Sequence, residues 1–554
     1  MHFLIIFYII IQTVLSENDP SIPPSCSSQI YCQGDLLKQI QLSAIYQDSK
    51  TFVDKSLRYD PEQVIENFNK LKSTFSNGIV PREQLISFVN ENFLNTSIVA
   101  KWTPPDWTAK PSIIKKIKDA DYQKFALDLN DIWKMLGRKV HNDSNPDRES
   151  VIYLPNGFIA PGGRFNELYY WDALWVIKGL ILCDMVQTAK GIIENFLYLV
   201  NVFGHIPNGS RVYYLERSQP PLLTLMVDAY YKATGDFQFI KDNIDIIDRE
   251  MDYFNSARMI DVTVSGHTYK MYRYHAVSSG PRPESFREDY EGALKLPEND
   301  RTNYYIELKS GAESGWDFSS RWYQTEGQNT TLLNIRTSTI IPVDLNAILH
   351  KCFKLLSEWY NKVGHKVKSQ QYRDLATQLQ TAIDNVLWNE EDGIWYDYDL
   401  MSNSSRKYFY MSNFVPLWTK SYKFPRVEIS KKIMHYILSY GLTSYVGGSP
   451  TSLDNSGQQW DFPNAWPPLQ AFLIQGLENI GTMDTSTTAF KLASIWVKTN
   501  YKGFQKYHLM FEKYDSLAVG KTGGGGEYQG QTGFGWTNGF VLELLNYYGR
   551  ELRS

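Results

Sequence analysis

Apolar residues recur at intervals of three and four along most of this 554-residue chain. The clearest stripe lies between residues 345 and 359 and consists of Leu345, Ile348, Leu349, Cys352, Leu355, Leu356 and Trp359. A second stripe follows Gly364 and consists of Tyr372, Leu375, Leu379, Ile383 and Leu387. This spacing places the apolar side chains on one face of an α-helix. Each such face must be buried against another element, so the pattern predicts a large helical protein.

The rest of the chain continues this pattern. Further helices are predicted at residues 172–200, 221–234, 468–480, 487–499 and 535–548, with long aromatic loops between them. A strand-then-helix alternation with glycine turns is absent, which argues against a parallel α/β fold. No low-complexity linker, charge block or strict repeat divides the chain. We therefore expect an all-α fold with a single large domain, in which the loops gather at one end to form a site.

The composition excludes some classes of function. Hydrophobic residues make up 43% of the chain and charged residues 21%, which is typical of a globular protein. The net charge of −4 argues against a protein that wraps nucleic acid or coats anionic lipid. The aromatic content is high at 14%. Aromatic rings can fill a large core or offer flat apolar faces to sugars, and the composition leaves both explanations open.

The N-terminus resembles a secretory signal peptide. Residues 3–14 form an almost continuous apolar run that is short for a membrane span, and cleavage is predicted after Ser16. An uncleaved N-terminal anchor is the alternative. Export is also favoured by five Asn-x-Ser/Thr sequons, at Asn95, Asn142, Asn208, Asn329 and Asn403. These features predict a soluble, secreted glycoprotein.

The four cysteines fit an oxidising compartment. Cys26 and Cys32 bracket a short loop just after the predicted cleavage site, where a small disulfide can form. Cys183 and Cys352 lie in apolar stretches and are expected to be buried free thiols.

Several common chemistries find no support. Gly520-Lys521-Thr522 resembles the end of a phosphate-binding loop, but Asp515 stands where the earlier glycine is required. The nine histidines form no helix-spaced metal pair, and there is no Cys-x-x-Cys motif. A Gly-x-Ser-x-Gly nucleophile elbow is also missing. We therefore expect neither a metal nor a cofactor.

What remains is a set of loops dense in arginine, carboxylate, tryptophan and glycine. They span residues 161–175, 208–221, 281–289, 313–322, 459–468 and 511–528. Each loop alone has a structural explanation, because Arg–carboxylate pairs and Trp near Gly are common in protein cores. Together they supply the donors and acceptors that sugar hydroxyls need. Cleavage of a glycosidic bond requires two carboxyl groups, one on each side of that bond.

Two carboxyls suit these roles. Asp317 lies between Trp316 and Phe318, and aromatic neighbours that exclude water raise the pKa of a carboxyl, as a general acid requires. Glu512 is followed by Lys513 and Tyr514 and is expected to remain ionised, as a general base must.

The loops that begin at Pro161 and Gln459 resemble the two signature motifs of trehalases, the glycoside hydrolases that split α,α-trehalose into two glucose molecules. The resemblance extends from about residue 26 to residue 548 and is strongest to secreted animal enzymes, including those of insects. It implies an (α/α)6 toroid and an inverting hydrolysis without cofactor. The expected organisation is a signal peptide at 1–16, an N-terminal segment at 17–50 and a catalytic domain at 51–554. The expected partner is the small-molecule substrate, with no nucleic acid and no membrane for the mature form.

The resemblance also implies roles for individual residues. Asp317 corresponds to the general acid and Glu512 to the general base, and an inverting pair should stand about 6.5–9.5 Å apart. The implied sugar-binding residues are Arg164, Trp171, Asp172, Asn208, Arg217, Ser218, Gln219, Arg282, Pro283, Glu284, Gly315 and Glu527. Phe165 and Trp460 are expected to be aromatic walls. Because a glycan on Asn208 would block the pocket, that sequon is predicted to be unoccupied.

Two other hypotheses stay open at this point. The chain could be another glycosidase or a phosphorylase on the same helical ring, because one fold hosts several chemistries. It could also be an inactive sugar-binding protein, although both carboxyls are present.

Overall fold

The computed structural model of the chain describes residues 22–95, 98–141, 145–325, 330–528 and 530–554. The predicted signal peptide and the sequon asparagines Asn142 and Asn329 lie outside the described residues. Within them, no helix combines the length and the apolar character that crossing a membrane requires.

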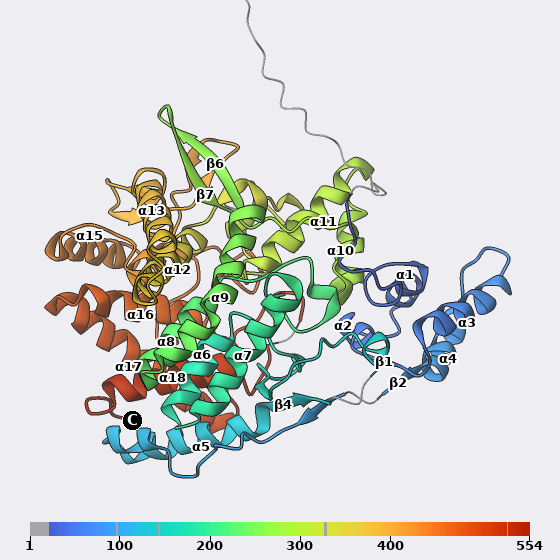
Figure 1. Cartoon of the computed structure of the whole chain (residues 1–554), viewed down its shortest axis with the longest axis horizontal. Coiled ribbons are helices and arrows are strands. Elements are labelled where there is room, and N and C mark those ends of the chain that lie inside the picture. Colours follow the sequence, from blue (N-terminus) through green and yellow to red (C-terminus); the bar gives the residue numbers. More distant parts are fainter. Residues whose placement is uncertain (1–21, 96–97, 142–144, 326–329, 529) are drawn as a thin grey trace, which may run out of the picture.

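An inner ring of helices forms the body of the molecule, and most of its members are labelled in the left half of Figure 1. Its members are α6 (Ala173–Leu182), α8 (Leu223–Thr234), α12 (Val343–Lys362), α14 (Val415–Thr419), α16 (Pro467–Ile480) and α18 (Gly535–Tyr548). Each packs on the next in this order, and α18 packs on α6, which closes the ring.

An outer layer of helices packs against this ring. Its members are α5 (Ala120–Leu136), α7 (Val186–Phe203), α9 (Phe237–Ala257), α13 (Lys366–Ala382), α15 (Arg426–Ser439) and α17 (Met483–Tyr507). Side-chain caps at Asp119, Asp236 and Thr482 begin α5, α9 and α17. The two layers confirm the predicted all-α, (α/α)6 toroid.

The predicted helices are present, with differences that have local causes. The stripe at 345–359 is the buried face of α12, and the stripe at 372–387 spans α13 and the π-helical turn that follows it. The single helix predicted at 172–200 is two helices, α6 and α7. Asp184 between them has a left-handed φ of 65°, which ends one helix and reverses the chain. Apolar periodicity alone did not reveal this break, because both helices are rich in apolar residues.

The strands are short and connect loops. The longest pair is the hairpin of β6 (Met259–Val264) and β7 (His267–Tyr272), in which Met259 pairs with Tyr272. The other sheets are all antiparallel. Three have two strands: β1 (Ser56–Leu57) with β2 (Phe93–Leu94), β9 (Trp388–Asn389) with β10 (Ile394–Trp395), and β13 (Asn464–Ala465) with β14 (Tyr514–Asp515). Two have three strands: β4 (Gly137–Val140) between β3 (Val99–Lys101) and β5 (Phe158–Ile159), and β11 (Tyr398–Asp399) between β8 (Ile340–Ile341) and β12 (Ser404–Ser405). The β13–β14 pair joins two of the predicted site loops, 459–468 and 511–528.

Four N-terminal helices form a second, smaller core beside the ring (Figure 1). They are α1 (Asp35–Leu42), α2 (Lys50–Val53), α3 (Pro61–Ser73) and α4 (Arg82–Asn92). Aromatic residues of the large domain complete this core: Tyr169, Tyr213, Tyr214 and Phe286. Phe286 begins α10 (Phe286–Ala293), which is followed by α11 (Glu298–Glu313). The predicted boundary between residues 50 and 51 falls inside α2, whose Lys50 forms an ion pair with Glu167 of the large domain.

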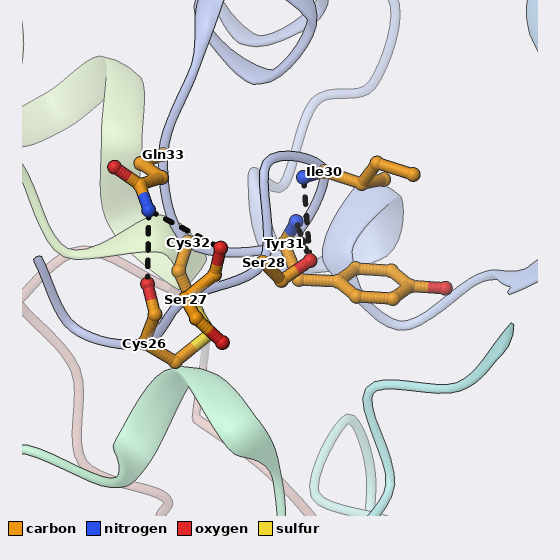
Figure 2. Close-up of a disulfide and its surroundings, with 7 residues drawn as sticks. All are labelled: Cys26, Ser27, Ser28, Ile30, Tyr31, Cys32 and Gln33. Atoms are coloured by element: carbon orange, nitrogen blue, oxygen red, sulfur yellow. Dashed lines mark hydrogen bonds between the residues drawn. A yellow bond between two sulfur atoms is a disulfide. The ribbon is translucent and has the colours of Figure 1, made fainter. Parts of the chain in front are cut away.

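The chain segment before α1 is held by a disulfide between Cys26 and Cys32 (Figure 2). The loop that it closes is also tied internally, because Gln33 donates to the carbonyl of Ser27 and Ser28 accepts from the backbone of Tyr31. Cys183 and Cys352 are buried free thiols, as predicted.

Candidate active site

The loops that precede the inner helices α6, α8, α12, α16 and α18 enclose one cavity. Both predicted catalytic carboxyls and most of the predicted sugar-binding residues line it: Arg164, Trp171, Asp172, Asn208, Arg217, Gln219, Arg282, Glu284, Gly315, Asp317, Glu512 and Glu527. Phe165 and Trp460, the expected aromatic walls, line it as well. Several inner helices direct their N-terminal, electropositive ends to this side of the ring, which suits a site rich in carboxylates.

Two predicted sugar-binding residues lie behind this lining. The hydroxyl of Ser218 donates to the carbonyl of Ile206, and its backbone N–H donates to Glu313. The carbonyl of Pro283 accepts a hydrogen bond from Gln41. In this structure both residues support neighbours that do line the cavity, Arg217 and Gln219 in one case and Arg282 and Glu284 in the other.

Tryptophan rings form one wall. Trp460 stacks on Trp466 with ring centroids 3.8 Å apart, and Trp171 lies 5.7 Å from Trp460 and 5.6 Å from Trp536. Gly315 lies directly against this wall, with a φ of 78° and room for no side chain, because an added Cβ would be 2.8 Å from the ring of Trp171. The wall offers apolar faces on which sugar rings can pack.

Asp317 is partly buried between two buried aromatic residues, Trp316 and Phe318. Burial raises the pKa of Asp317 to about 7, the positive charge of Arg282 opposes the rise, and the negative charge of Glu527 adds to it. Asp317 is therefore largely protonated below neutral pH, which is the state a general acid needs.

Glu512 is surrounded by donors. The hydroxyl of Tyr528 donates to Oε1 over 3.0 Å, and the ammonium of Lys513 lies 3.2 Å from Oε2. The backbone N–H of Gln531 donates to the same oxygen over 3.4 Å. Such partners stabilise a negative carboxylate.

A hydrogen-bond chain joins the two carboxyl residues. Gln459 donates through Nε2 to the backbone carbonyl of Asp317 over 2.5 Å and accepts from Lys513 over 2.7 Å. Lys513 in turn pairs with Glu512. The chain fixes the loop of Asp317 relative to the loop of Glu512.

Three arginines line the cavity, each held by a carboxylate. Arg217 pairs with Glu284 and also donates to Asn208, and Arg282 pairs with Asp289 and Glu527. Arg164 pairs with Asp48. In all three, the guanidinium hydrogen bonds made within the described part of the chain use Nε and Nη2, so Nη1 is left for a ligand.

Glu284 and Asp172 are further acidic groups of the cavity. Oε2 of Glu284 is buried without a partner among the described residues. Burial raises the pKa of Asp172 to about 8, with further contributions from the charges of Glu512 and Asp317. Buried polar atoms without a protein partner are costly unless a ligand or water supplies one. A polyhydroxyl ligand has the donors that Oε2 of Glu284 lacks.

Some lining residues were not assigned from the sequence. They are Pro161, Tyr169, Tyr214, Ser285, Ala312, Trp466, Tyr528, Phe534 and Trp536. Most stand in the same loops as the assigned residues, so proximity along the chain was the available signal. Asp48, which pairs with Arg164 but does not line the cavity, had no such signal, because it lies far from Arg164 in sequence.

Within the described residues, no group of three or more His, Cys, Asp or Glu side chains is arranged to hold a metal ion. The chemistry available in the cavity is that of carboxyls, three arginines and aromatic rings.

Comparison with known proteins shows the family of the chain. A sequence profile of the trehalase family matches residues 44–549. The chain is 48% identical over 528 residues to a trehalase of Pimpla hypochondriaca, covering 94% of this chain and 90% of that one. It is 46% identical over 537 residues to a trehalase of Homo sapiens, covering 96% and 92%.

A solved structure supports the fold. The neutral trehalase of Saccharomyces cerevisiae superposes with a TM-score of 0.56 at 24% identity, covering 71% of this chain and 73% of that one. With a family profile that spans nearly the whole chain and relatives that align along most of their length, the chain belongs to the trehalase family of glycoside hydrolases.

Proposed function

We propose that this chain is a secreted trehalase that hydrolyses α,α-trehalose to two glucose molecules by a single displacement with inversion. The observation that carries the proposal is the pairing of two unlike carboxyls in one cavity. Burial raises the pKa of Asp317 to about 7, whereas Glu512 is surrounded by donors. Unlike environments of this kind separate an acid from a base.

In the proposed reaction, Asp317 donates its proton to the glycosidic oxygen as the bond to the anomeric carbon breaks. Glu512 accepts a proton from a water molecule, whose oxygen attacks the same carbon from the opposite face. The attacked ring is released as β-glucose and the other ring as α-glucose. We expect about 6.5–9.5 Å between the two carboxyls, the space that an intervening water requires.

The remaining lining residues are proposed to bind the two sugar rings. Arg164, Arg217 and Arg282 would donate to sugar hydroxyls through their Nη1 groups. Glu284 and Asp172 would form hydrogen bonds with other sugar hydroxyls. The same assignment is proposed for Trp171, Asn208, Gln219, Gly315 and Glu527. Ser218 and Pro283 would act by supporting these neighbours.

The test is glucose release from trehalose, followed by NMR from the first minutes, with maltose and sucrose as controls. Equal initial amounts of α- and β-glucose from trehalose alone would establish substrate and stereochemistry together. Release of α-glucose only would contradict inversion, and cleavage of maltose instead would contradict the substrate.

Secretion is proposed from the N-terminal apolar run, the sequons and the disulfide between Cys26 and Cys32. The sequon asparagines Asn95 and Asn403 are exposed, as glycosylation requires. N-terminal sequencing of protein collected from the medium tests the proposal. The expected first residue is Glu17, and a chain retained in the membrane with Met1 in place would contradict it.

A further inference from the structure

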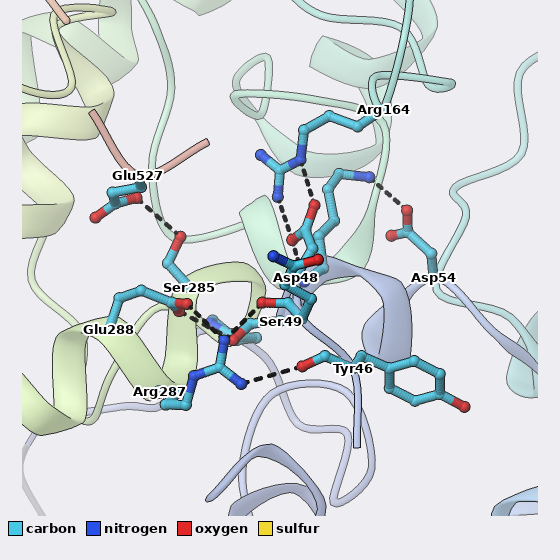
Figure 3. A network of polar contacts seen from close by, with 12 residues as sticks. Tyr46, Asp48, Ser49, Asp54, Arg164, Ser285, Arg287, Glu288 and Glu527 are labelled. Carbon is cyan, nitrogen blue, oxygen red and sulfur yellow. Dashed lines mark hydrogen bonds and ion pairs between the residues drawn. The ribbon is translucent and has the colours of Figure 1, made fainter. Parts of the chain in front are cut away.

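Asp48 stands outside the cavity and holds one of its arginines (Figure 3). We propose that Asp48 is a positioning residue for the sugar site: it fixes the guanidinium of Arg164 so that the remaining donor, Nη1, is presented to the substrate. The inference rests on the proposed function, because it takes Arg164 to be a sugar ligand. On this proposal, the N-terminal segment before α2 contributes to substrate binding by orienting Arg164.

The contact is a two-point fork. Arg164 donates from Nε to Oδ2 of Asp48 over 2.7 Å and from Nη2 to Oδ1 over 2.6 Å. Such bidentate pairs fix orientation as well as distance. The guanidinium also lies 4.7 Å from the ring centroid of Tyr528 and 5.3 Å from that of Phe165. Rings hold the plane of the guanidinium, and the carboxylate sets its rotation within that plane.

Asp48 is itself held in place. Its Oδ1 accepts from the backbone N–H of Lys50 over 2.9 Å, at the start of α2. Burial raises the pKa of Asp48, but hydrogen bonding and charge from Arg164 outweigh it, so this pKa lies below its ordinary value. Asp48 is therefore an anion at the pH values at which the enzyme would work, and its two oxygens are both acceptors.

Asp48 acts through Arg164 and has no direct place in the catalytic cavity. The described lining of the cavity includes Arg164 but not Asp48, which borders the adjoining hollow beside the 523–528 loop. The side chain of Asp48 is 37% exposed and that of Arg164 18%. From this position Asp48 can set where Nη1 of Arg164 points.

The segment that carries Asp48 does not depend on this contact for its docking. Lys50 is buried and pairs with Glu167 over 2.8 Å, and Asp54 lies 3.3 Å from Arg211. Ser49 donates to Glu288 over 3.0 Å. These anchors follow Asp48 along the chain, so loss of the Asp48 carboxylate should disturb Arg164 without releasing α2.

The experiment is a double-mutant cycle on the full-length enzyme, with kcat and KM measured on trehalose. Asp48→Asn keeps the size of the side chain but removes the charge and one of the acceptors. We expect KM to rise about 10-fold with a much smaller change in kcat, because Arg164 binds a part of the sugar that does not react. Asp48→Glu, which keeps the carboxylate, should recover most of the affinity.

The cycle with Arg164→Ala separates positioning from a general structural role. If Asp48 acts through Arg164, the double variant loses no more kcat/KM than Arg164→Ala alone, because nothing is left to position. Losses that multiply would overturn the proposal. So would an unchanged KM in Asp48→Asn, or a lowered midpoint of thermal unfolding in that variant with unchanged kinetics per folded molecule.

Asp35→Asn is the matched control. Asp35 lies in the same N-terminal segment and pairs over 2.6 Å with Lys72, both partly exposed. The substitution removes the same charge and is expected to leave KM and kcat unchanged. Failure of the proposed function has a different signature, since wild-type enzyme would then release no glucose from trehalose. In that case the same cycle can be run on whichever α-glucoside is cleaved.

Discussion

The ammonium group of Lys513 lies 3.2 Å from the carboxylate of Glu512, and neither side chain has appreciable contact with solvent. The two residues are adjacent in sequence, yet they meet only because further partners hold them. Lys513 also donates to Gln459 and lies 4.8 Å from the ring centroid of Trp466. The proposed base is thus one half of a buried ion pair that belongs to the same polar chain as the acid.

Replacing the lysine tests this arrangement. Lys513→Met leaves the carboxylate of Glu512 buried without its cation and removes the partner of Gln459. We expect kcat to fall on the order of 10²-fold, the usual loss for one charge-stabilising donor at a catalytic centre. Lys521→Met, at an exposed lysine that pairs with Asp515, is the control and should leave kcat within error of wild type. Equal activity of both variants would remove Lys513 from the catalytic network.

Removing the proposed acid should abolish turnover but not binding. Asp317→Asn keeps the shape of the side chain and has no acidic proton to donate. We expect kcat to fall by about 10²–10⁴-fold, the usual contribution of general acid catalysis. Calorimetry on the same variant should still detect trehalose, since the arginines and the tryptophan wall are intact. Near-normal kcat in Asp317→Asn would exclude it as the acid.

The pH dependence of kcat/KM should show the raised pKa of Asp317. The acid works only when protonated, and burial raises its pKa to about 7. Activity is therefore retained below that pH and declines by about 10-fold per pH unit above it. Glu527→Gln should shift this decline to lower pH, because the negative charge of Glu527 helps to raise the pKa of Asp317. A profile that stays level well into alkaline pH would contradict the assignment.

The sequence predicted the individual helices better than the way in which they pack to form the cavity, and the reasons are physical. The stripe at 345–359 reports burial directly, so α12 could be read from it. The turn at Asp184 depends on a single backbone angle and leaves no trace in apolar periodicity. The carboxyls Asp317 and Glu512 were identified from their loops, but their common cavity depends on how the ring closes, which no local pattern specifies. Asp48 reaches Arg164 across the interface of two cores.

The sequon at Asn208 should carry no glycan. Asn208 is buried, and its side-chain carbonyl accepts from Arg217 over 2.8 Å. A glycan on its amide nitrogen would have to fill the cavity. We expect glycopeptide mapping of the secreted protein to find Asn208 unmodified and exposed Asn403 occupied. A glycan at Asn208 would contradict its assignment to the sugar site.

Gly315 should tolerate no side chain for two reasons, its left-handed backbone and its contact with Trp171. Another glycine of the chain serves as a control that separates the two. A methyl group at residue 315 would adopt a φ of 78° and meet the ring of Trp171 at 2.8 Å. Gly364, between α12 and α13, has a φ of 90° but no atom within 4 Å of an added Cβ. Gly364→Ala therefore measures backbone strain alone, which we expect to cost about 1–2 kcal/mol of unfolding free energy.

Gly315→Ala carries the same strain and also displaces the tryptophan wall. We expect it to cost more stability than Gly364→Ala and, unlike that variant, to raise KM for trehalose, because Trp171 lines the cavity. Urea denaturation of both variants gives the difference in unfolding free energy, and steady-state kinetics give the difference in KM. Similar kinetics for the two variants would mean that Trp171 can shift without consequence for the site. A selective rise in KM for Gly315→Ala would show that the close approach of this glycine to the ring keeps the sugar-binding wall in place.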